Sequence, residues 1–218
     1  MAKPLLKKKQ VIVFEGDSGT SRCRLADRDT WAFLRLMNWH VTYADLVGEW
    51  LFCNRPDLAL NIFNTAVAGA KCYDMASRYE SLVKPRKPDW VIFTLGGNDA
   101  AVNVPAKQFR QTIRDYAQWV KDDSGGRMFC VGGFVKKTQP APIRRRRMRN
   151  YRILREVMAE CGGIYLDAGT PLARKEKLLI QHSAMHTIVS DNHYNIVGAT
   201  IIANQVLQGL RILKIIEP

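Results

Sequence analysis

Residues 10–21 read "QVIVFEGDSGTS", a strand pattern followed by an unusual loop. Gln10–Glu15 are mostly β-branched or apolar, which predicts a buried strand that ends at Gly16. A glycine before and a glycine after Ser18 permit a tight turn and a close approach by a substrate. Two interpretations follow: Ser18 is the N-cap of the next helix, or it is a nucleophile presented at the end of a strand.

Three better-known loop motifs do not match this stretch. Thr20 stands where a Gly-x-Ser-x-Gly motif needs its second glycine, so the nucleophile elbow of the α/β-hydrolases is a poor match. The loop also lacks the Gly-Lys-Ser/Thr of a phosphate-binding loop and the Gly-x-Gly-x-x-Gly of a dinucleotide site. Any catalytic role of Ser18 therefore depends on residues elsewhere in the chain.

Short apolar runs alternate with segments of helical periodicity along the chain. Further strands are predicted at Leu58–Phe63, Trp90–Leu95, Arg127–Val131 and Ile164–Leu166. Helices are predicted at Trp31–Phe52 (two helices, broken near His40), Tyr73–Val83, Ala106–Lys121, Ile143–Cys161 and Ile196–Leu213. This alternation predicts an α/β fold with a parallel sheet and helices on both faces.

Size and composition set the domain organisation that we expect. A chain of 218 residues with 47% hydrophobic residues predicts one α/β domain over residues 1–218, with a basic and loosely ordered N-terminus at 1–9. The chain shows neither a signal peptide nor a membrane-length apolar stretch, so we expect it in the cytoplasm. A net charge of +13 attracts anions, which include nucleic acid, anionic lipid, coenzyme A esters and acidic glycans, or it serves solubility alone.

The cysteines and histidines could form a disulfide framework or a metal site. The cysteines are odd in number and never form a Cys-x-x-Cys pair, which predicts reduced and mostly packed thiols. They are Cys23, Cys53, Cys72, Cys130 and Cys161. His182, His186 and His193, with Asp191 among them, form a candidate metal cluster. However, "HSAMH" lacks the glutamate of His-Glu-x-x-His, and a metal site leaves Ser18 unexplained.

Three more loops carry residues suited to acyl transfer. Asn64–Ala70 contains Gly69, whose backbone N–H can face a site, although a simple turn explains it equally. Gly96–Asp99 contains Asn98, which is either an oxyanion donor or a turn and cap residue. His193 precedes the last helix and is either a general base or a structural histidine. Because strand-end loops of a parallel sheet gather at one edge, these loops and the serine loop together predict one acyl-transfer site.

The segments "GDSGT", Gly69, "GGND" and "DNHYNIVG" together resemble the SGNH hydrolases, the GDSL-type esterase and lipase superfamily. The resemblance implies a three-layer α/β/α sandwich with a central parallel sheet of about five strands in flavodoxin-like order. It implies that Ser18 is the nucleophile and His193 the base. The implied oxyanion hole consists of the Ser18 and Gly69 backbone N–H groups and the Asn98 side chain. The implied activity is ester hydrolysis through an acyl-enzyme, without metal or organic cofactor.

One position departs from the family pattern. The family usually has an aspartate three residues before the histidine, where this chain has Ser190, and Asp191 follows one residue later. Three interpretations are open: Asp191 still orients the imidazole, Ser18 and His193 act as a dyad helped by a backbone carbonyl, or activity is impaired. We expect the first.

An arginine run follows the fourth predicted strand, at Arg144, Arg145, Arg146 and Arg147. We expect these residues at the rim of the active site, where they would favour an anionic ester, whether a small molecule, a lipid or a glycan. The alternative is a solvated helix face opposite a buried stripe of Met148, Tyr151, Leu154 and Met158. A rival function is a catalytically weak protein that binds anionic ligands or nucleic acid through these arginines. No recognised nucleic-acid motif accompanies them, so nucleic acid is the less favoured ligand.

Overall fold

A computed structural model of the chain describes residues 4–21, 41–133, 135, 139–183 and 194–213. Its centre is a sheet of five parallel strands in the order β2-β1-β3-β4-β5. The strands are β1 (Val11–Gly16), β2 (Asn61–Asn64), β3 (Trp90–Thr94), β4 (Arg127–Gly132) and β5 (Ile164–Asp167). All five predicted strands are therefore confirmed, and the order is the flavodoxin-like one, which reverses direction beside β1.

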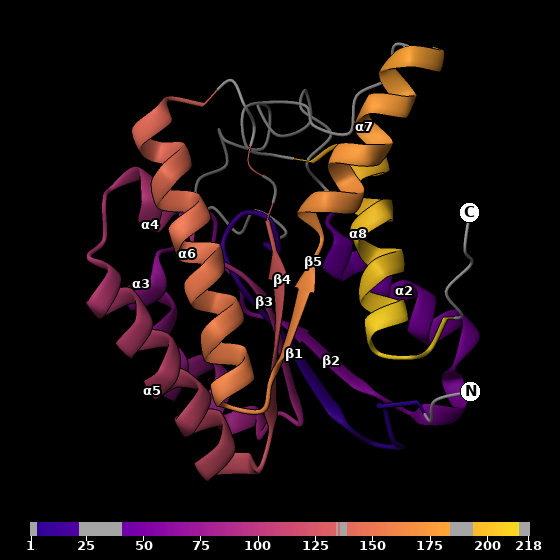
Figure 1. The fold of residues 1–218 in the computed structure, drawn as a ribbon. Helices are drawn as coiled ribbons and strands as arrows, with labels where there is room; N and C mark the ends of the chain where they lie inside the picture. Colours follow the sequence, from indigo (N-terminus) through magenta and orange to yellow (C-terminus); the bar gives the residue numbers. More distant parts are fainter. Residues whose placement is uncertain (1–3, 22–40, 134, 136–138, 184–193, 214–218) are drawn as a thin grey trace, which may run out of the picture.

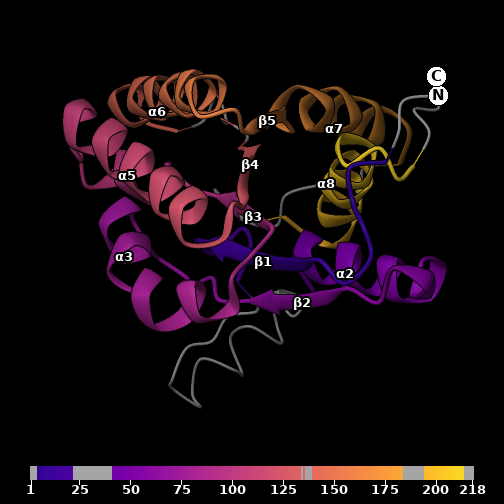
Figure 2. The same cartoon turned by 90° about the horizontal axis from the view of Figure 1, so that it is seen from below.

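Helices cover both faces of this sheet, as Figures 1 and 2 show. One layer contains α2 (Tyr43–Asn54), α7 (Gly169–Ser183) and α8 (Ile196–Gly209). The other contains α3 (Cys72–Ser77), α5 (Ala106–Ser124) and α6 (Ala141–Glu160), and the short α4 (Gly97–Ala101) packs against α6. The predicted α/β/α sandwich is confirmed.

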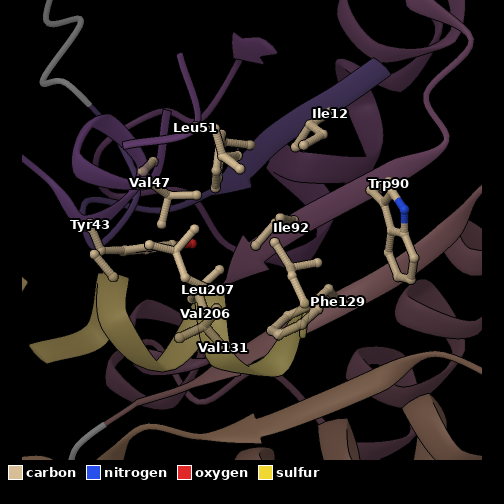
Figure 3. Packing of buried hydrophobic residues seen from close by; sticks show 14 of the residues in the cluster. Ile12, Tyr43, Val47, Leu51, Trp90, Ile92, Phe129, Val131, Val206 and Leu207 are labelled. Atoms are coloured by element: carbon tan, nitrogen blue, oxygen red, sulfur yellow. The ribbon is translucent and has the colours of Figure 1, made fainter. Parts of the chain in front are cut away.

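Alternation along the strands divides the core into two clusters. Towards α2 and α8 the sheet contributes Ile12, Phe14, Ile92, Phe129 and Val131, which pack on residues such as Val47 and Val206 (Figure 3). Towards α3, α5 and α6 it contributes Val13, Val91, Phe93, Met128 and Cys130. Because both faces are buried, the central strands consist of almost continuous apolar runs.

Several predicted helices and one predicted strand differ from those in the structure. The segment Tyr73–Val83, predicted as one helix, is α3 followed by a π-helical turn at Tyr79–Val83. The strand predicted from Leu58 begins at Asn61, because Pro56–Leu58 forms a 3₁₀ turn and Ala59 has a left-handed φ of 44°. α7 was not predicted, since its charged residues hide the helical period and Leu172 is the residue of its first turn that is fully buried. The first part of the predicted segment Trp31–Phe52 lies outside the described residues.

The N-terminal segment and the cysteines also have defined positions. Leu6 is buried in the α2–α8 cluster, and Lys9 N donates to Leu58 O at 2.8 Å, within the segment that the sequence predicts to be loosely ordered. Among the described cysteines, all are free thiols, buried at Cys72 and Cys130 but exposed at Cys53 and Cys161. No described helix is long and apolar enough to span a bilayer.

Candidate active site

The serine loop begins where β1 ends, at the carboxyl edge of the sheet. Gly16 has a φ of 117°, and a Cβ there would lie 2.0 Å from Thr94 O, so this position requires glycine. Asp17 N donates to Thr94 O at 3.2 Å, which continues the pairing of β1 with β3 by one residue. The sheet therefore holds the backbone up to the residue before Ser18.

The Asp17 carboxylate closes the turn around Ser18. Its Oδ1 accepts from Gly19 N and from Thr94 Oγ1, both at 3.0 Å. Its backbone oxygen accepts from Thr20 N at 3.0 Å and Ser21 N at 2.9 Å. Ser18, which is partly exposed, is thus held in a closed turn that begins with an Asx-type bond.

The pKa of Asp17 is raised to about 6, chiefly because the carboxyl group is removed from water and in spite of its hydrogen bonds from Gly19 and Thr94. Since the folded pKa lies above the ordinary aspartate value of 3.8, the folded state holds this proton more tightly than the unfolded state does. The contribution of Asp17 to stability is therefore most favourable at low pH and decreases as the pH rises towards 6.

Asp17→Asn should remove this pH dependence. As the pH rises from about 4 to 7, the wild type should lose up to about 3 kcal/mol of its free energy of unfolding relative to the variant. Urea unfolding at a series of pH values measures the difference, with Asp122→Asn, at an exposed carboxylate, as the control. Parallel pH profiles for wild type and Asp17→Asn would contradict the burial of this charge.

The second loop, residues 64–70, follows β2 and is bonded to the serine loop. Asn64 Nδ2 donates to Thr20 O at 2.9 Å, and Val67 N donates to Gly16 O at 3.2 Å. Gly69 lies exposed in this loop with a φ of 79°, a conformation that favours glycine. The loop that carries the predicted Gly69 donor is therefore anchored to the loop that carries Ser18.

The third loop follows β3 and runs directly into α4. Asn98, predicted in a loop, lies in the first turn of α4, and its Nδ2 donates to Ala70 O at 3.1 Å. Asp99 is fully buried, and its Oδ1 accepts from Cys72 N at 2.8 Å at the start of α3. The structure therefore joins the Ser18, Gly69 and Asn98 loops in one hydrogen-bonded series.

A buried ion pair beneath these loops was not predicted. Glu15 is fully buried, and its carboxylate binds the Arg78 guanidinium, Thr65 Oγ1 and Gly16 N. Arg78 Nη2 also donates to Gly16 O at 2.9 Å, the oxygen that Val67 N contacts. A carboxylate within an apolar strand was a sequence signal for Glu15, whereas nothing in the sequence distinguished Arg78 from the other arginines.

The predicted base and its partner, His193 and Asp191, lie outside the described residues, as does Ser190. The described chain resumes at Tyr194, and Asn195 Oδ1 accepts from Gly198 N at 3.0 Å as the N-cap of α8. Tyr194 packs against the core cluster of α2 and α8 that contains Tyr43, and the Tyr43 hydroxyl lies 3.0 Å from Thr20 Oγ1 in the serine loop. The residue that follows His193 in sequence therefore packs on the same cluster as a tyrosine that is hydrogen-bonded to the serine loop.

The predicted arginine group divides in two. Arg144 and Arg145 line a surface groove, whereas Arg147 is 8% exposed and its guanidinium lies against Gly97, where a Cβ would approach Nη2 to 2.6 Å. Burial dominates the raised pKa of Asp17, and the positive charge of Arg147 opposes it. The stripe predicted from Met148 is wrong at that residue, which is 60% exposed, because the helix turns Arg147 and Asn150 inward instead. Arg146 is partly buried and is not part of the groove lining.

The described residues contain no group of histidines, cysteines and carboxylates arranged to hold a metal ion. His182 belongs to α7, whereas His186 and His193 lie outside the described residues. The alternative metal cluster therefore stays a prediction. What the described residues do contain is a serine in a fixed turn, with two further loops bonded beside it.

A parallel α/β sandwich with a serine loop and two bonded loops at the carboxyl edge of its sheet is the arrangement of the GDSL-type carboxylic-ester hydrolases. The chain belongs to the GDSL-like lipase/acylhydrolase family, whose profile matches residues 15–199. The family resemblance carried by "GDSGT" and "GGND" is thereby confirmed.

Individual relatives agree with this assignment. A protein named acetylxylan esterase from Geobacillus stearothermophilus is 24% identical over 166 residues, which cover 72% of this chain and 74% of the relative. An alpha/beta hydrolase enzyme from the metagenome of Lake Arreo, Spain, superposes with a TM-score of 0.79 at 21% identity, covering 97% of this chain and 100% of that one. These similarities show the shared fold.

Two solved structures of the Geobacillus stearothermophilus acetylxylan esterase are of catalytic mutants. In one a serine is replaced by alanine, and it superposes with a TM-score of 0.78 at 19% identity, covering 98% of this chain and 99% of that one. In the other a histidine is replaced by alanine, and it superposes with a TM-score of 0.75 at 21% identity, covering 94% and 95%.

Proposed function

We propose that this protein is a serine esterase that cleaves carboxylic esters through an acyl-enzyme on Ser18. The observation that carries the proposal is the hydrogen-bonded series that joins the Ser18, Gly69 and Asn98 loops at one edge of the sheet. A nucleophile and its oxyanion donors must keep a fixed spacing, and such bonds between their loops keep it.

In the proposed reaction His193 takes the proton of Ser18 while Ser18 Oγ attacks the ester carbonyl. The Ser18 and Gly69 backbone N–H groups and Asn98 Nδ2 stabilise the oxyanion. His193 then protonates the leaving alcohol, and a water molecule activated by the same imidazole attacks the acyl-enzyme and releases the acid. The Asn98 amide carries two N–H groups, so it can hold Ala70 O with one and an oxyanion with the other.

Two facts support His193 as the base. Tyr194, the residue after His193, packs against the core cluster of Tyr43, whose hydroxyl is hydrogen-bonded to Thr20 in the serine loop. The related acetylxylan esterase has a catalytic mutant at a histidine as well as one at a serine. Asp191 is the proposed orienter of the imidazole, and the Ser18–His193 dyad is the alternative.

The proposed substrate is an acetyl ester on a saccharide. The support is the relative named acetylxylan esterase, which covers most of this chain. The net charge of +13 and the exposed arginines beside the sheet edge further support a saccharide that carries negative charge.

Hydrolysis and covalent labelling together test the proposal. The protein should hydrolyse p-nitrophenyl acetate faster than longer p-nitrophenyl esters, and a fluorophosphonate should block this activity by forming one adduct on Ser18, located by peptide mass spectrometry. An adduct at another residue, or hydrolysis that survives full labelling, would refute the serine mechanism. Chelation should leave the activity intact, whereas loss of activity with metal removal would favour the histidine cluster.

Asn98→Ala should lower kcat by about 10²–10³-fold and change KM little, because an oxyanion donor acts mainly in the transition state. Steady-state kinetics on p-nitrophenyl acetate measure both constants. Asn54→Ala is the matched control, since Asn54 is an exposed asparagine whose Nδ2 also donates to a backbone oxygen, that of Trp50. A raised KM with an unchanged kcat would assign Asn98 to ground-state binding instead.

A further inference from the structure

A groove of about 860 Å³ lies along α6, at the edge of the sheet formed by β5. Figure 2 shows α6 and α7 on either side of β5. One face of α6, the end of β4 and the first turn of α7 supply most of the lining. The lining includes five arginines: Arg144, Arg145, Arg149, Arg152 and Arg155.

The charge of this groove is unbalanced. Asp167 is the one acidic residue of its described lining, and its carboxylate caps α7. Asp167 Oδ1 accepts from Gly169 N at 3.1 Å and Thr170 N at 3.2 Å, and Oδ2 accepts from Thr170 Oγ1 at 2.9 Å. With its only described carboxylate engaged in this way, the groove has an excess of positive charge that faces solvent.

Three of the arginines that line the groove are exposed to solvent. The side chains of Arg152 and Arg155 are 73% and 64% exposed. Their ion pairs are long, at 3.8 Å from Arg152 Nε to Glu156 Oε1 and 4.0 Å from Arg155 Nη2 to Asp167 Oδ2. Arg145 is exposed as well, whereas Arg149 is engaged with Val104 O at 2.9 Å. Arg145 and Arg155 are separated by about 15 Å along the helix at 1.5 Å per residue, which suits a ligand with spaced charges.

The inner end of the groove adjoins the active-site edge of the sheet. Tyr151 lines it, and the Tyr151 hydroxyl lies against Gly133 at the end of β4. The Tyr151 ring also lies against Gly96, two residues before Asn98, where a Cβ would approach Tyr151 Cε1 to 3.6 Å. β4 lies two strands from β1 in the sheet, a separation of about 10 Å. A chain molecule in the groove can therefore extend to the serine loop.

The floor of the groove is aromatic. Tyr165 lines it beside Tyr151, and the Arg155 guanidinium stacks over the Tyr165 ring at 5.1 Å from the centroid. Flat aromatic and guanidinium surfaces suit the apolar faces of sugar rings, and free guanidinium donors suit carboxylates through paired hydrogen bonds. The volume lies in the range of small-ligand pockets, which suits a short saccharide better than a nucleic-acid helix.

We propose that this groove binds the carboxylate-bearing sugars of an acidic oligosaccharide whose acetyl ester reaches Ser18. The inference rests on the proposed function, because the ester at Ser18 gives the groove its place in catalysis. Arg145, Arg152 and Arg155 contact the carboxylates, and the groove selects acidic saccharides over neutral ones.

Binding to the Ser18→Ala protein tests the groove without turnover. The probes are a xylo-oligosaccharide that carries a glucuronate, the same oligosaccharide without it, and a single-stranded oligonucleotide of equal charge, each titrated calorimetrically. We expect the acidic saccharide to bind roughly tenfold more tightly than the neutral one, since each exposed arginine–carboxylate contact contributes roughly fivefold or less. Added salt should reduce the preference.

Charge-matched variants locate the effect. Replacing Arg145, Arg152 and Arg155 by glutamine should abolish the preference for the acidic saccharide. Replacing Lys8, Lys107 and Lys121, exposed lysines outside the groove lining, by glutamine removes the same charge and should leave the preference intact. In the otherwise wild-type enzyme, the arginine variant should lower the ratio of kcat/KM for acidic over neutral acetylated saccharide about tenfold, and the lysine variant should not.

Three results would overturn the groove proposal: equal binding of both saccharides, an equal loss of preference in the lysine variant, or tighter binding of the oligonucleotide, which would indicate a nucleic-acid surface.

Hydrolysis of p-nitrophenyl acetate separates the groove proposal from the esterase proposal. If the wild type cleaves no ester but the acidic preference persists, the esterase proposal fails and the groove stands as a saccharide-binding site. If esters are cleaved without the preference, only the groove fails.

Discussion

Ser18→Ala should lower kcat for p-nitrophenyl acetate by at least about 10⁴-fold, the largest effect that we expect from any single substitution. The methyl group occupies the same partly exposed turn but cannot form the acyl-enzyme, so only direct attack by water remains. The Asp17 bonds that close the turn involve the backbone of residues 19–21 and Thr94, so the substitution should leave the fold intact.

The control for this experiment is Ser21→Ala, a serine that is buried at the end of the same loop. It should retain most of the activity, while unfolding of both variants in urea reports any loss of stability. Turnover by Ser18→Ala within tenfold of the wild type would exclude Ser18 as the nucleophile. The rival function, a catalytically weak protein that binds anions, predicts equal and very low turnover in both proteins.

Arg78→Met should lower the free energy of unfolding by about 3–5 kcal/mol at neutral pH, because it leaves the Glu15 carboxylate buried without its cation. The Glu15 side chain is 0% exposed and that of Arg78 is 11% exposed, so water cannot replace the lost partner. kcat should fall as well, since Arg78 also holds Gly16 O, to which the second loop is bonded.

The pH dependence identifies the cause. Burial raises the pKa of Glu15 above its usual value of 4.5 even with Arg78 present, and loss of the cation raises the pKa further. A carboxyl group whose pKa is raised in the folded state stabilises the fold at pH values below its pKa in the unfolded state. This stabilisation is lost as the pH rises through its pKa in the folded state. The defect of Arg78→Met should therefore be small near pH 4.5 and grow towards neutrality.

A second substitution provides the sharper test. Glu15→Gln combined with Arg78→Met removes the buried charge and keeps an acceptor for Gly16 N, while the glutamine NH₂ can donate to Thr65 Oγ1, which itself donates to Phe14 O. The double variant should recover at least about 2 kcal/mol of the loss. Arg114→Met is the control for loss of an arginine, since its ion pair with Glu160 lies at the surface. If the double variant is no more stable than Arg78→Met, the loss of stability comes from the packing of Arg78 and not from its charge.

Local sequence patterns predicted most of the architecture because strands and helices follow from apolar periodicity. Trp90–Thr94 and Arg127–Gly132 are buried runs whose residues alternate between two apolar clusters, and such runs are visible without a structure. α7 was missed because Arg174, Lys175 and Lys177 are exposed charges that interrupt its apolar pattern, so the packing of Leu172, not periodicity, decides that helix. The predicted stripe of α6 is right at Leu154 and Met158 but wrong at Met148, because the buried face there contains Arg147 and Asn150, which a hydrophobicity pattern assigns to solvent.

The candidate site shows the same division. Ser18, Gly69 and Asn98 could be predicted because each follows a strand, and parallel strands bring their carboxyl ends to one edge. The Glu15–Arg78 pair, the Arg147 contact with Gly97 and the groove along α6 could not be predicted, because their partners are far apart in the sequence.

By itself the sequence determined the α/β class, the strands and the loops that carry the candidate catalytic residues, since these depend on short-range patterns of burial and turn chemistry. Which charges are buried beneath those loops, and which arginines are exposed in a common groove, depends on how distant elements pack together. The physical reason is that the environment of a charged side chain is set by the elements packed against it, and a local pattern of residues does not contain those neighbours.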